Sequence, residues 1–137
     1  MNQTACASPP RLCVLLLDDD SFTLDLLAEM LDQIGQFDVI AESDAKRALA
    51  VLRERRPDLL VCDLSMPDMD GIEFLHVAAD TGFSGHVMLL SGLHSGVRNA
   101  AERLARAAGL KLLGAFRKPI SAEDMRGALH TLQALPR

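Results

Sequence analysis

The chain has 137 residues, of which 49% are hydrophobic and 24% are charged, and fourteen Lys and Arg against nineteen Asp and Glu leave a net charge of −5. That length corresponds to about one domain of ordinary size, and the composition is typical of a globular protein and argues against a disordered one. The acidic balance and the low aromatic content of 4% argue against nucleic-acid binding, and no apolar run approaches the ~20 residues that span a bilayer.

The three cysteines, Cys6, Cys13 and Cys62, are odd in number and lack metal-ligand spacing, which favours a reducing, cytoplasmic environment. The polar residues 1–11 have no signal-peptide pattern, and we expect residues 1–10 to be flexible. We expect residues 11–135 to form the domain, with 136–137 as its C-terminal end or the start of a linker. The expectation is therefore a cytoplasmic domain without membrane attachment.

Apolar runs alternate with helical patterns in the first half of the chain. In order, the predicted elements are a strand at 12–17, a helix closed by Gly35, a strand at 37–41, a helix from Ser43 or Asp44 that ends before Pro57, and a strand at 59–62 that ends in Asp63. The helices are predicted from apolar residues at i, i+3, i+4 and i+7. The strand at 12–17 is almost purely aliphatic, as expected when both faces of a strand are covered.

The second half continues the alternation. Its predicted elements are a loop at 64–71 followed by a helix, a strand at 87–90 that ends in Ser91, a helix at 95–108 closed by Gly109, a strand within 111–117, and a helix from the cap at Ser121 through Leu132. Five strand and helix units predict an α/β domain with one open parallel sheet and helices on both faces.

Polar side chains stand at the carboxyl ends of four predicted strands. They are Asp18, Asp19 and Asp20 after the first strand, Asp63 after the third, Ser91 after the fourth and Lys118 after the fifth. In a doubly wound sheet these strand ends meet around one crevice, where ligands bind. We therefore expect the chemistry of the protein at this edge.

The three adjacent aspartates indicate a cation site. Like charges repel one another, and a divalent cation relieves that repulsion. Oxygen ligands without nearby His or Cys favour Mg²⁺, with Mn²⁺ as the alternative. Asp18 and Asp19 are the expected ligands, whereas Asp20 is predicted to cap the following helix.

Asp63 is the candidate nucleophile. A carboxylate can attack a phosphoryl group and form an acyl phosphate, and phosphoryl transfer requires mainly positioning and charge neutralisation. A metal on Asp18 and Asp19 and the ammonium of Lys118 would supply that neutralisation, and the hydroxyl of Ser91 can donate to a phosphoryl oxygen.

Four motifs in this order resemble a response-regulator receiver domain of two-component signalling, over residues 12–135. They are LLLDDDS at 15–21, DLLVCDLSMPDMDG at 58–71, LLSG at 89–92 and FRKP at 116–119. The resemblance implies the flavodoxin-like (βα)5 fold, with strand order 2-1-3-4-5.

The resemblance also assigns roles. It makes Asp63 the phosphoacceptor from a histidine kinase or phosphotransfer protein, Ser91 the switch hydroxyl, and Lys118 the phosphoryl-binding cation, with a cis peptide bond between Lys118 and the proline after it. It implies that Asp18, Asp19, Asp63 and the backbone carbonyl of Ser65 hold Mg²⁺, Asp18 through water.

Output would pass through one face of the domain. By resemblance, phosphorylation alters the face of the fourth helix, fifth strand and last helix, which controls an output domain or partner and is also the expected homodimer surface. Residues 105–114 resemble receivers fused to Glu-Ala-Leu-type cyclic-di-GMP phosphodiesterases. Beyond self-phosphorylation and autodephosphorylation, no enzymatic activity is expected.

The sequence departs from the receiver pattern in two places. Ala115 stands where receivers often carry an aromatic residue three positions before the lysine, and Phe116, one position later, is expected on the opposite side of its strand. The segment from Ser91 to Lys118 is also longer than usual by more than one helical turn.

Two alternatives remain. A pseudo-receiver would keep the fold as an interaction module without phosphorylation. A haloacid-dehalogenase-type phosphatase would use Asp18 as nucleophile within its Asp-x-Asp motif, although that family usually needs a cap and a longer chain, and it leaves Asp63 without its role.

Overall fold

The structure, a computed structural model, describes residues 11–66, 71–92 and 95–135. Its strands are β2 (Leu12–Leu17), β3 (Phe37–Glu42), β4 (Leu59–Asp63), β5 (His86–Ser91) and β6 (Lys111–Arg117). Its helices are α1 (Ser21–Ile34), α2 (Ala45–Arg55), α3 (Gly71–Asp80), α4 (Ser95–Ala107) and α5 (Ala122–Ala134). The flexibility expected at 1–10 and the chain end at 136–137 concern residues outside the described ones.

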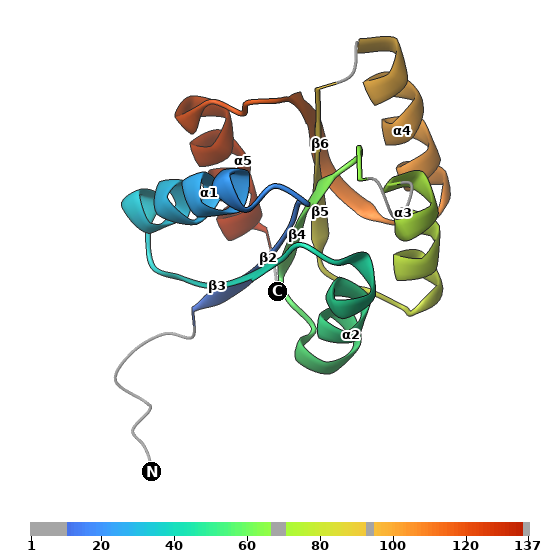
Figure 1. Ribbon diagram of the computed structural model, residues 1–137, viewed down its shortest axis with the longest axis horizontal. Helices are drawn as coiled ribbons and strands as arrows, with labels where there is room; N and C mark the ends of the chain where they lie inside the picture. Colours follow the sequence, from blue (N-terminus) through green and yellow to red (C-terminus); the bar gives the residue numbers. More distant parts are fainter. Residues whose placement is uncertain (1–10, 67–70, 93–94, 136–137) are drawn as a thin grey trace.

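The five strands form one parallel sheet in the order β3-β2-β4-β5-β6. Counted along the chain, this is the order 2-1-3-4-5, so the predicted flavodoxin-like α/β fold is confirmed. Figure 1 shows α1 and α5 on one side of the sheet, and α2, α3 and α4 on the other. The order brings the carboxyl ends of β2 and β4 side by side, with β5 and β6 following.

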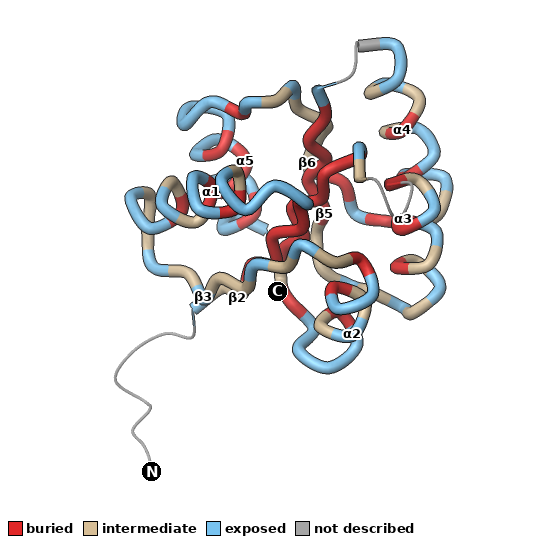
Figure 2. The backbone as a smooth tube through the Cα atoms, viewed as in Figure 1, coloured by how far each residue is buried: buried red, intermediate tan, exposed pale blue. Residues whose placement is uncertain are grey.

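The core lies on both faces of the sheet because successive strand side chains point to opposite faces. In β2, Leu15 and Leu17 pack with α2, α3 and α4, whereas Val14 and Leu16 pack with α1 and α5. The buried positions follow the central strands in Figure 2. The aliphatic run of β2 is thus explained by burial on both faces, as the sequence indicated.

One irregularity in β6 decides where its bulky side chain lies. Val87 is paired with Leu112 and Met88 with Gly114, so Leu113 is an extra residue in the register of β5 and β6. Because of this shift, Ala115 packs on the α2, α3 and α4 side, and Phe116 packs on the α1 and α5 side. The expectation that Phe116 faces away from Ala115 is confirmed.

Polar caps begin two of the helices as predicted. The carboxylate of Asp20 accepts hydrogen bonds from the backbone N–H of Phe22 at 3.1 Å and from the hydroxyl of Thr23 at 2.9 Å, at the start of α1. The hydroxyl of Ser121 accepts from the N–H of Asp124 at 3.0 Å, at the start of α5. Helix α5 runs two residues beyond the predicted end, to Ala134.

Among the described helices, none has the length and apolar character needed to cross a lipid bilayer.

Candidate functional site

The carboxyl edge of the sheet gathers the polar residues that the sequence singled out. Asp18 follows β2 directly, Asp63 ends β4, Ser91 ends β5, and Lys118 follows β6. The register pairs Asp63 with Leu90, which places Ser91 one residue beyond the partner of Asp63. Asp18, Asp63 and Ser91 are buried, with exposed fractions of 1%, 2% and 0%. Buried polar groups at a sheet edge need partners, and Asp18 and Asp63 both have one in Lys118.

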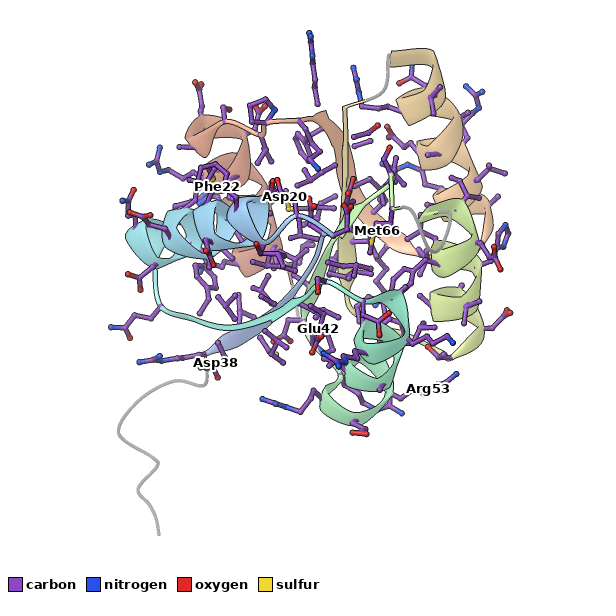
Figure 3. The ribbon with its side chains drawn as sticks, in the orientation of Figure 1. Asp20, Phe22, Asp38, Glu42, Arg53 and Met66 are labelled. Atoms are coloured by element: carbon purple, nitrogen blue, oxygen red, sulfur yellow. The ribbon has the colours of Figure 1, made fainter. Side chains whose placement is uncertain are left out.

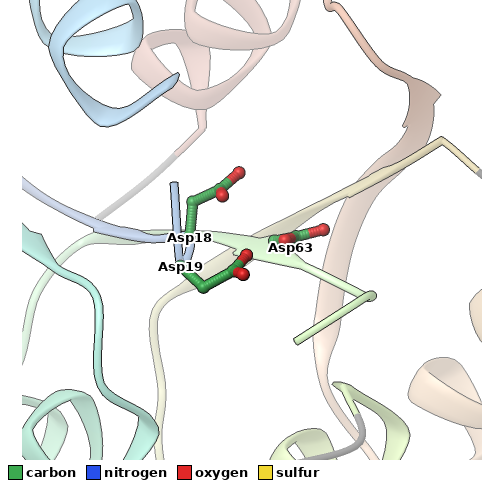
Figure 4. A group of neighbouring side chains, drawn as sticks. All are labelled: Asp18, Asp19 and Asp63. Atoms are coloured by element: carbon green, nitrogen blue, oxygen red, sulfur yellow. The ribbon is translucent and has the colours of Figure 1, made fainter. Parts of the chain in front are cut away.

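Three carboxylates form a cluster that fits a divalent cation. Each of Asp18, Asp19 and Asp63 offers one oxygen, and these three oxygens lie within 4.8 Å of one another. Figure 4 shows the three side chains projecting from neighbouring strand ends into the same region. An all-oxygen donor set with one exposed member suits Mg²⁺ or Mn²⁺, which keep several water ligands, better than Zn²⁺.

Asp20 does not belong to that cluster. Its carboxylate is used in capping α1, and its own backbone N–H donates to Oδ1 of Asp18 at 2.9 Å. This bond helps to orient the Asp18 carboxylate. The three consecutive aspartates therefore divide into two candidate ligands and one helix cap, as the sequence predicted. Asp20 and Phe22 are labelled at the start of α1 in Figure 3.

Lys118 holds the buried carboxylates together. Its Nζ lies 2.9 Å from Oδ2 of Asp18 and 3.6 Å from Oδ1 of Asp63, and its side chain is 25% exposed. Burial by itself lowers the pKa of Lys118, but the hydrogen bond to Asp18 and the charge of Asp63 outweigh it, so the pKa is raised. The lysine is thus a fixed cation between two strand ends that are 45 positions apart in the sequence.

The carboxyl group of Asp63 has a raised pKa. Burial, followed by the charges of Asp18 and Asp19, raises its pKa from 3.8 to about 6, although the N–H of Ser65 and the charge of Lys118 act in the opposite direction. The N–H of Ser65 donates to Oδ1 of Asp63 at 3.1 Å. A cation bound among the three carboxylates would favour the ionised form of Asp63.

Backbone hydrogen bonds fix the strand ends around Asp63. The N–H of Leu64 donates to the carbonyl of Leu90 at 2.9 Å, and the N–H of Lys118 donates to the carbonyl of Ser91 at 2.9 Å. The peptide bond between Lys118 and Pro119 is cis, as the resemblance implied. The structure therefore brings all the predicted site residues to one edge. The role of the Ser65 carbonyl stays a prediction.

Cys62 precedes Asp63 and points to the opposite side of the sheet, into the core with α2, α3 and α4. Burial, with the charges of Asp63 and Asp18, strongly raises the pKa of its thiol. A protonated thiol is a poor nucleophile, so we expect this buried cysteine to be chemically inert.

A cavity of about 420 Å³ beside the site was not foreseen from the sequence. It is lined by α1 residues, including Leu26 and Met30, and by Lys118, Pro119 and Ile120 at the start of the last segment. Phe22 and Leu26 on α1 are 67% and 48% exposed. The available signal was the presence of large apolar residues in α1 outside its buried stripe of Leu24, Leu27 and Leu31.

A comparison with family models agrees with this geometry: the model described as "Response regulator receiver domain" matches residues 14–130. The chain belongs to the response-regulator receiver family. Because that family accounts for the arrangement from β2 to α5, the haloacid-dehalogenase alternative is set aside.

Two relatives show how receivers are used in longer and shorter proteins. The cyclic di-GMP phosphodiesterase RocR of Pseudomonas aeruginosa is 32% identical over 117 residues, which are 85% of this chain but only 30% of that protein. The probable chemotaxis protein CheY of Rhizobium etli is 25% identical over 122 residues, 89% of this chain and 92% of that protein. The match thus covers less than a third of RocR and nearly all of the CheY protein.

Solved structures agree on the fold. A response regulator from Colwellia psychrerythraea has a TM-score of 0.77 and 35% sequence identity, covering 90% of this chain and 97% of that one. A CheY-like receiver domain protein from Methanospirillum hungatei has the same TM-score of 0.77 at 23% identity, covering 90% of this chain and 95% of that one, which supports the fold alone.

Proposed function

We propose that this receiver accepts a phosphoryl group on Asp63 from a histidine kinase or a histidine phosphotransfer protein, in a Mg²⁺-dependent reaction, and so switches an output domain or partner. The observation that carries the proposal is the convergence of three carboxylates, within 4.8 Å of one another, beside the ammonium of Lys118. The carboxylates of such a site repel one another and therefore attract a cation. The cation and the ammonium of Lys118 together attract a phosphoryl group, and phosphoryl transfer requires this neutralisation of charge.

Asp63 is the nucleophile in this proposal. One of its carboxylate oxygens forms a bond to phosphorus while the bond from phosphorus to the donor histidine nitrogen breaks. The electron pair of the broken bond returns to the imidazole ring, which takes a proton from water. Lys118, which pairs with Asp18 and Asp63, would neutralise an oxygen of the new acyl phosphate.

Asp18, Asp19, Asp63 and the backbone carbonyl of Ser65 are the proposed ligands of Mg²⁺. When bound, the ion would neutralise the carboxylates and the phosphoryl oxygens. The N–H of Ser65 already orients Asp63 by donating to its Oδ1. Asp20 supports the cluster from outside by fixing the start of α1.

The switch passes from Ser91 to the face formed by α4, β6 and α5. In this proposal, the Ser91 hydroxyl donates to a phosphoryl oxygen, and the new bond shifts the population of conformations of that face. An inward swing of an aromatic side chain plays no part, because Ala115 is the residue on the α4 side and Phe116 packs against α1 and α5. The same face is the proposed surface for homodimer formation.

The phosphodonor protein is proposed to dock on α1. The exposed Phe22 and Leu26 and the cavity that extends from Leu26 to Lys118 and Pro119 form an apolar surface beside the phosphoacceptor. Burial of such a surface favours association. Transfer from purified histidine kinases should therefore be slowed by L26E, whereas phosphorylation by acetyl phosphate should be unaffected.

The proposed location is the cytoplasm, where Cys13 and Cys62, both free thiols, stay reduced. The proposed activity is limited to self-phosphorylation and autodephosphorylation. The likeness to RocR suggests cyclic-di-GMP phosphodiesterase signalling as the first output to test. An effect of the phosphorylated receiver on cyclic-di-GMP turnover would support that output, and a natural reading frame without a phosphodiesterase partner and without such an effect would exclude it.

The central experiment is phosphorylation by acetyl phosphate with Mg²⁺, followed by mass spectrometry of the intact protein. The wild type should gain one phosphoryl group, and D63N should gain none. The matched control is D80N, because Asp80 is an exposed aspartate at the end of α3, and it should be labelled like the wild type. Labelling of D63N would overturn the assignment, and a wild type that takes up neither a phosphoryl group nor beryllofluoride would indicate a pseudo-receiver.

A further inference from the structure

A second cavity lies at the opposite, amino edge of the sheet. Its volume is about 350 Å³, near the lower end of the range for small-molecule pockets. It is lined by residues at or just before the starts of β2, β4, β5 and β6 and by residues at the end of α5. Three of these strands lead to Asp63, Ser91 and Lys118 at the other edge, so this amino-edge pocket shares strands with the phosphorylation site but none of its residues.

The lining of the amino-edge pocket is cationic. Its cations are Arg56 and Lys111, which come from two separate elements, and Asp58 is the acidic residue among the described lining residues. One oxygen of the Asp58 carboxylate, Oδ2, accepts a hydrogen bond from the N–H of Cys13 at 2.8 Å. Arg56 and Lys111 are both exposed, so their charged groups can reach a ligand with little rearrangement.

The pKa of His86 also reflects the positive charge of the pocket. Burial lowers the pKa of this half-buried histidine, and the charge of Lys111 lowers it further. The imidazole is therefore neutral at pH 7 and can offer one N–H donor and one nitrogen acceptor. The two fixed cations exceed the one acid, so the pocket has a net positive charge in a protein whose overall charge is −5.

The pocket also has an apolar wall. Leu12, Pro57, Leu132 and Leu135 line it beside the charged groups. Leu135 is 37% exposed, which leaves apolar surface for a ligand to cover. Cationic groups next to aliphatic side chains fit a molecule with an acidic group at one end and a small apolar body at the other.

We propose that the amino-edge pocket binds a small organic anion, whose phosphate or carboxylate group is held by Arg56 and Lys111 and whose apolar part packs on Leu132 and Leu135. The site is separate from the phosphorylation site, so the proposal stands or falls independently of the function proposed above.

The test is an NMR titration of the D63N protein without Mg²⁺, with phenyl phosphate as the probe. The amide signals of Asp58, Gly85, His86 and Lys111 should shift together with one dissociation constant, while those of Asp63 and Ser91 should not move. Benzoate tests whether a carboxylate serves as well as a phosphate. Inorganic phosphate and neutral benzyl alcohol, which each carry half of the proposed ligand, should both bind more weakly.

The variant pair that tests the cations is R56N with K111Q. Arg56 has a φ of 45°, in the left-handed region, and Asn adopts that conformation readily, so R56N removes the charge without straining the end of α2. We expect affinity for phenyl phosphate to fall on the order of tenfold or more, the loss expected when charge-assisted hydrogen bonds are removed.

The matched control is R53Q with R103Q, which removes two exposed arginines outside the pocket and changes the net charge equally. This control should bind phenyl phosphate like the parent protein. Equal losses in both double variants, or undiminished binding to the R56N/K111Q protein, or shifts scattered over the surface, would overturn the proposal. Thermal unfolding of each variant establishes that it is folded.

Discussion

The two edges of the sheet hold charged groups under opposite conditions. At the carboxyl edge, Asp18 and Asp63 are buried and pair with Lys118 at 2.9 Å and 3.6 Å. At the amino edge, Arg56 and Lys111 are exposed around an open cavity. The same strands connect both edges, so strand composition does not explain why the charges are paired at one edge and exposed at the other. The two edges differ in burial, and a buried charge at the carboxyl edge is stable only with an oppositely charged neighbour.

This comparison predicts that changes of charge at the carboxyl edge alter stability and its dependence on pH and metal, whereas changes of charge at the amino edge alter ligand binding and have little effect on stability. The tests below run from the largest expected effect to the smallest.

Removal of the Lys118 ammonium at the carboxyl edge should have the largest effect on stability. K118M leaves Asp18 and Asp63 buried without their partner, and we expect the free energy of unfolding at pH 7 without metal to fall by about 3 kcal/mol. Urea denaturation measures the loss, and millimolar Mg²⁺ should restore most of it by replacing the missing positive charge. K46M, at an exposed position of α2, is the control and should change little. An unchanged free energy of unfolding in K118M would show that the pairing of Lys118 with Asp18 and Asp63 contributes nothing to stability.

Removal of the Asp63 charge should stabilise the metal-free protein. The pKa of Asp63 is raised from 3.8 to about 6, so the folded state disfavours its ionised form. The wild type therefore loses stability as pH rises from about 4 through 6, whereas D63N does not. We expect D63N to be more stable by about 2 kcal/mol at pH 7 and no more stable at pH 3.5. Chemical denaturation across that range measures the difference, and a gain that grows toward low pH would contradict the sign.

Two glycines make close approaches at opposite edges. A Cβ on Gly71 would lie 2.6 Å from Cα of Leu64, next to Asp63, and one on Gly85 would lie 2.5 Å from the carbonyl oxygen of Pro57, at the amino-edge pocket. G71A and G85A should each cost about 1.5 kcal/mol, because backbone atoms must move. G127A, whose Cβ would meet nothing within 4 Å, should not destabilise α5.

The same pair distinguishes the edges functionally. G71A should also reduce phosphorylation by acetyl phosphate, since Leu64 adjoins Asp63, whereas G85A should leave the labelled fraction unchanged. Equal effects of the two variants on labelling would mean that the edges are not independent.

A change of charge at the amino edge should have the smallest effect on stability. K111Q removes an exposed cation, and we expect the free energy of unfolding to change by less than about 0.5 kcal/mol. Phosphorylation on Asp63 should be unaffected. A stability loss comparable to that of K118M would show that Lys111, like Lys118, compensates a buried charge.

Much of the fold follows from local patterns in the sequence. The aliphatic run at 12–17, the helical spacing and the capping residues Asp20 and Ser121 predicted the order and type of the elements, because hydrophobic period and helix caps act within a few residues. Parallel strands joined by helices then place Asp18, Asp63, Ser91 and Lys118 at one edge, whatever the details of packing.

Other features depend on contacts between distant segments. The extra residue Leu113 in β6 is visible only when β6 is aligned with β5, and it determines which helices Phe116 contacts. The amino-edge pocket likewise arises from the meeting of several strand starts with the end of α5, and no run of residues marks it.

The sequence alone therefore determined which polar groups meet and at which edge of the sheet they lie, because periodicity and turn signals are local. Only the tertiary structure decided that Lys118 is bound to Asp18 and Asp63, that burial raises the pKa of Asp63 to about 6, and that a cationic cavity lies at the other edge. Ion pairing, desolvation and cavities depend on distances between residues far apart in the chain, and those distances exist only once the sheet has formed.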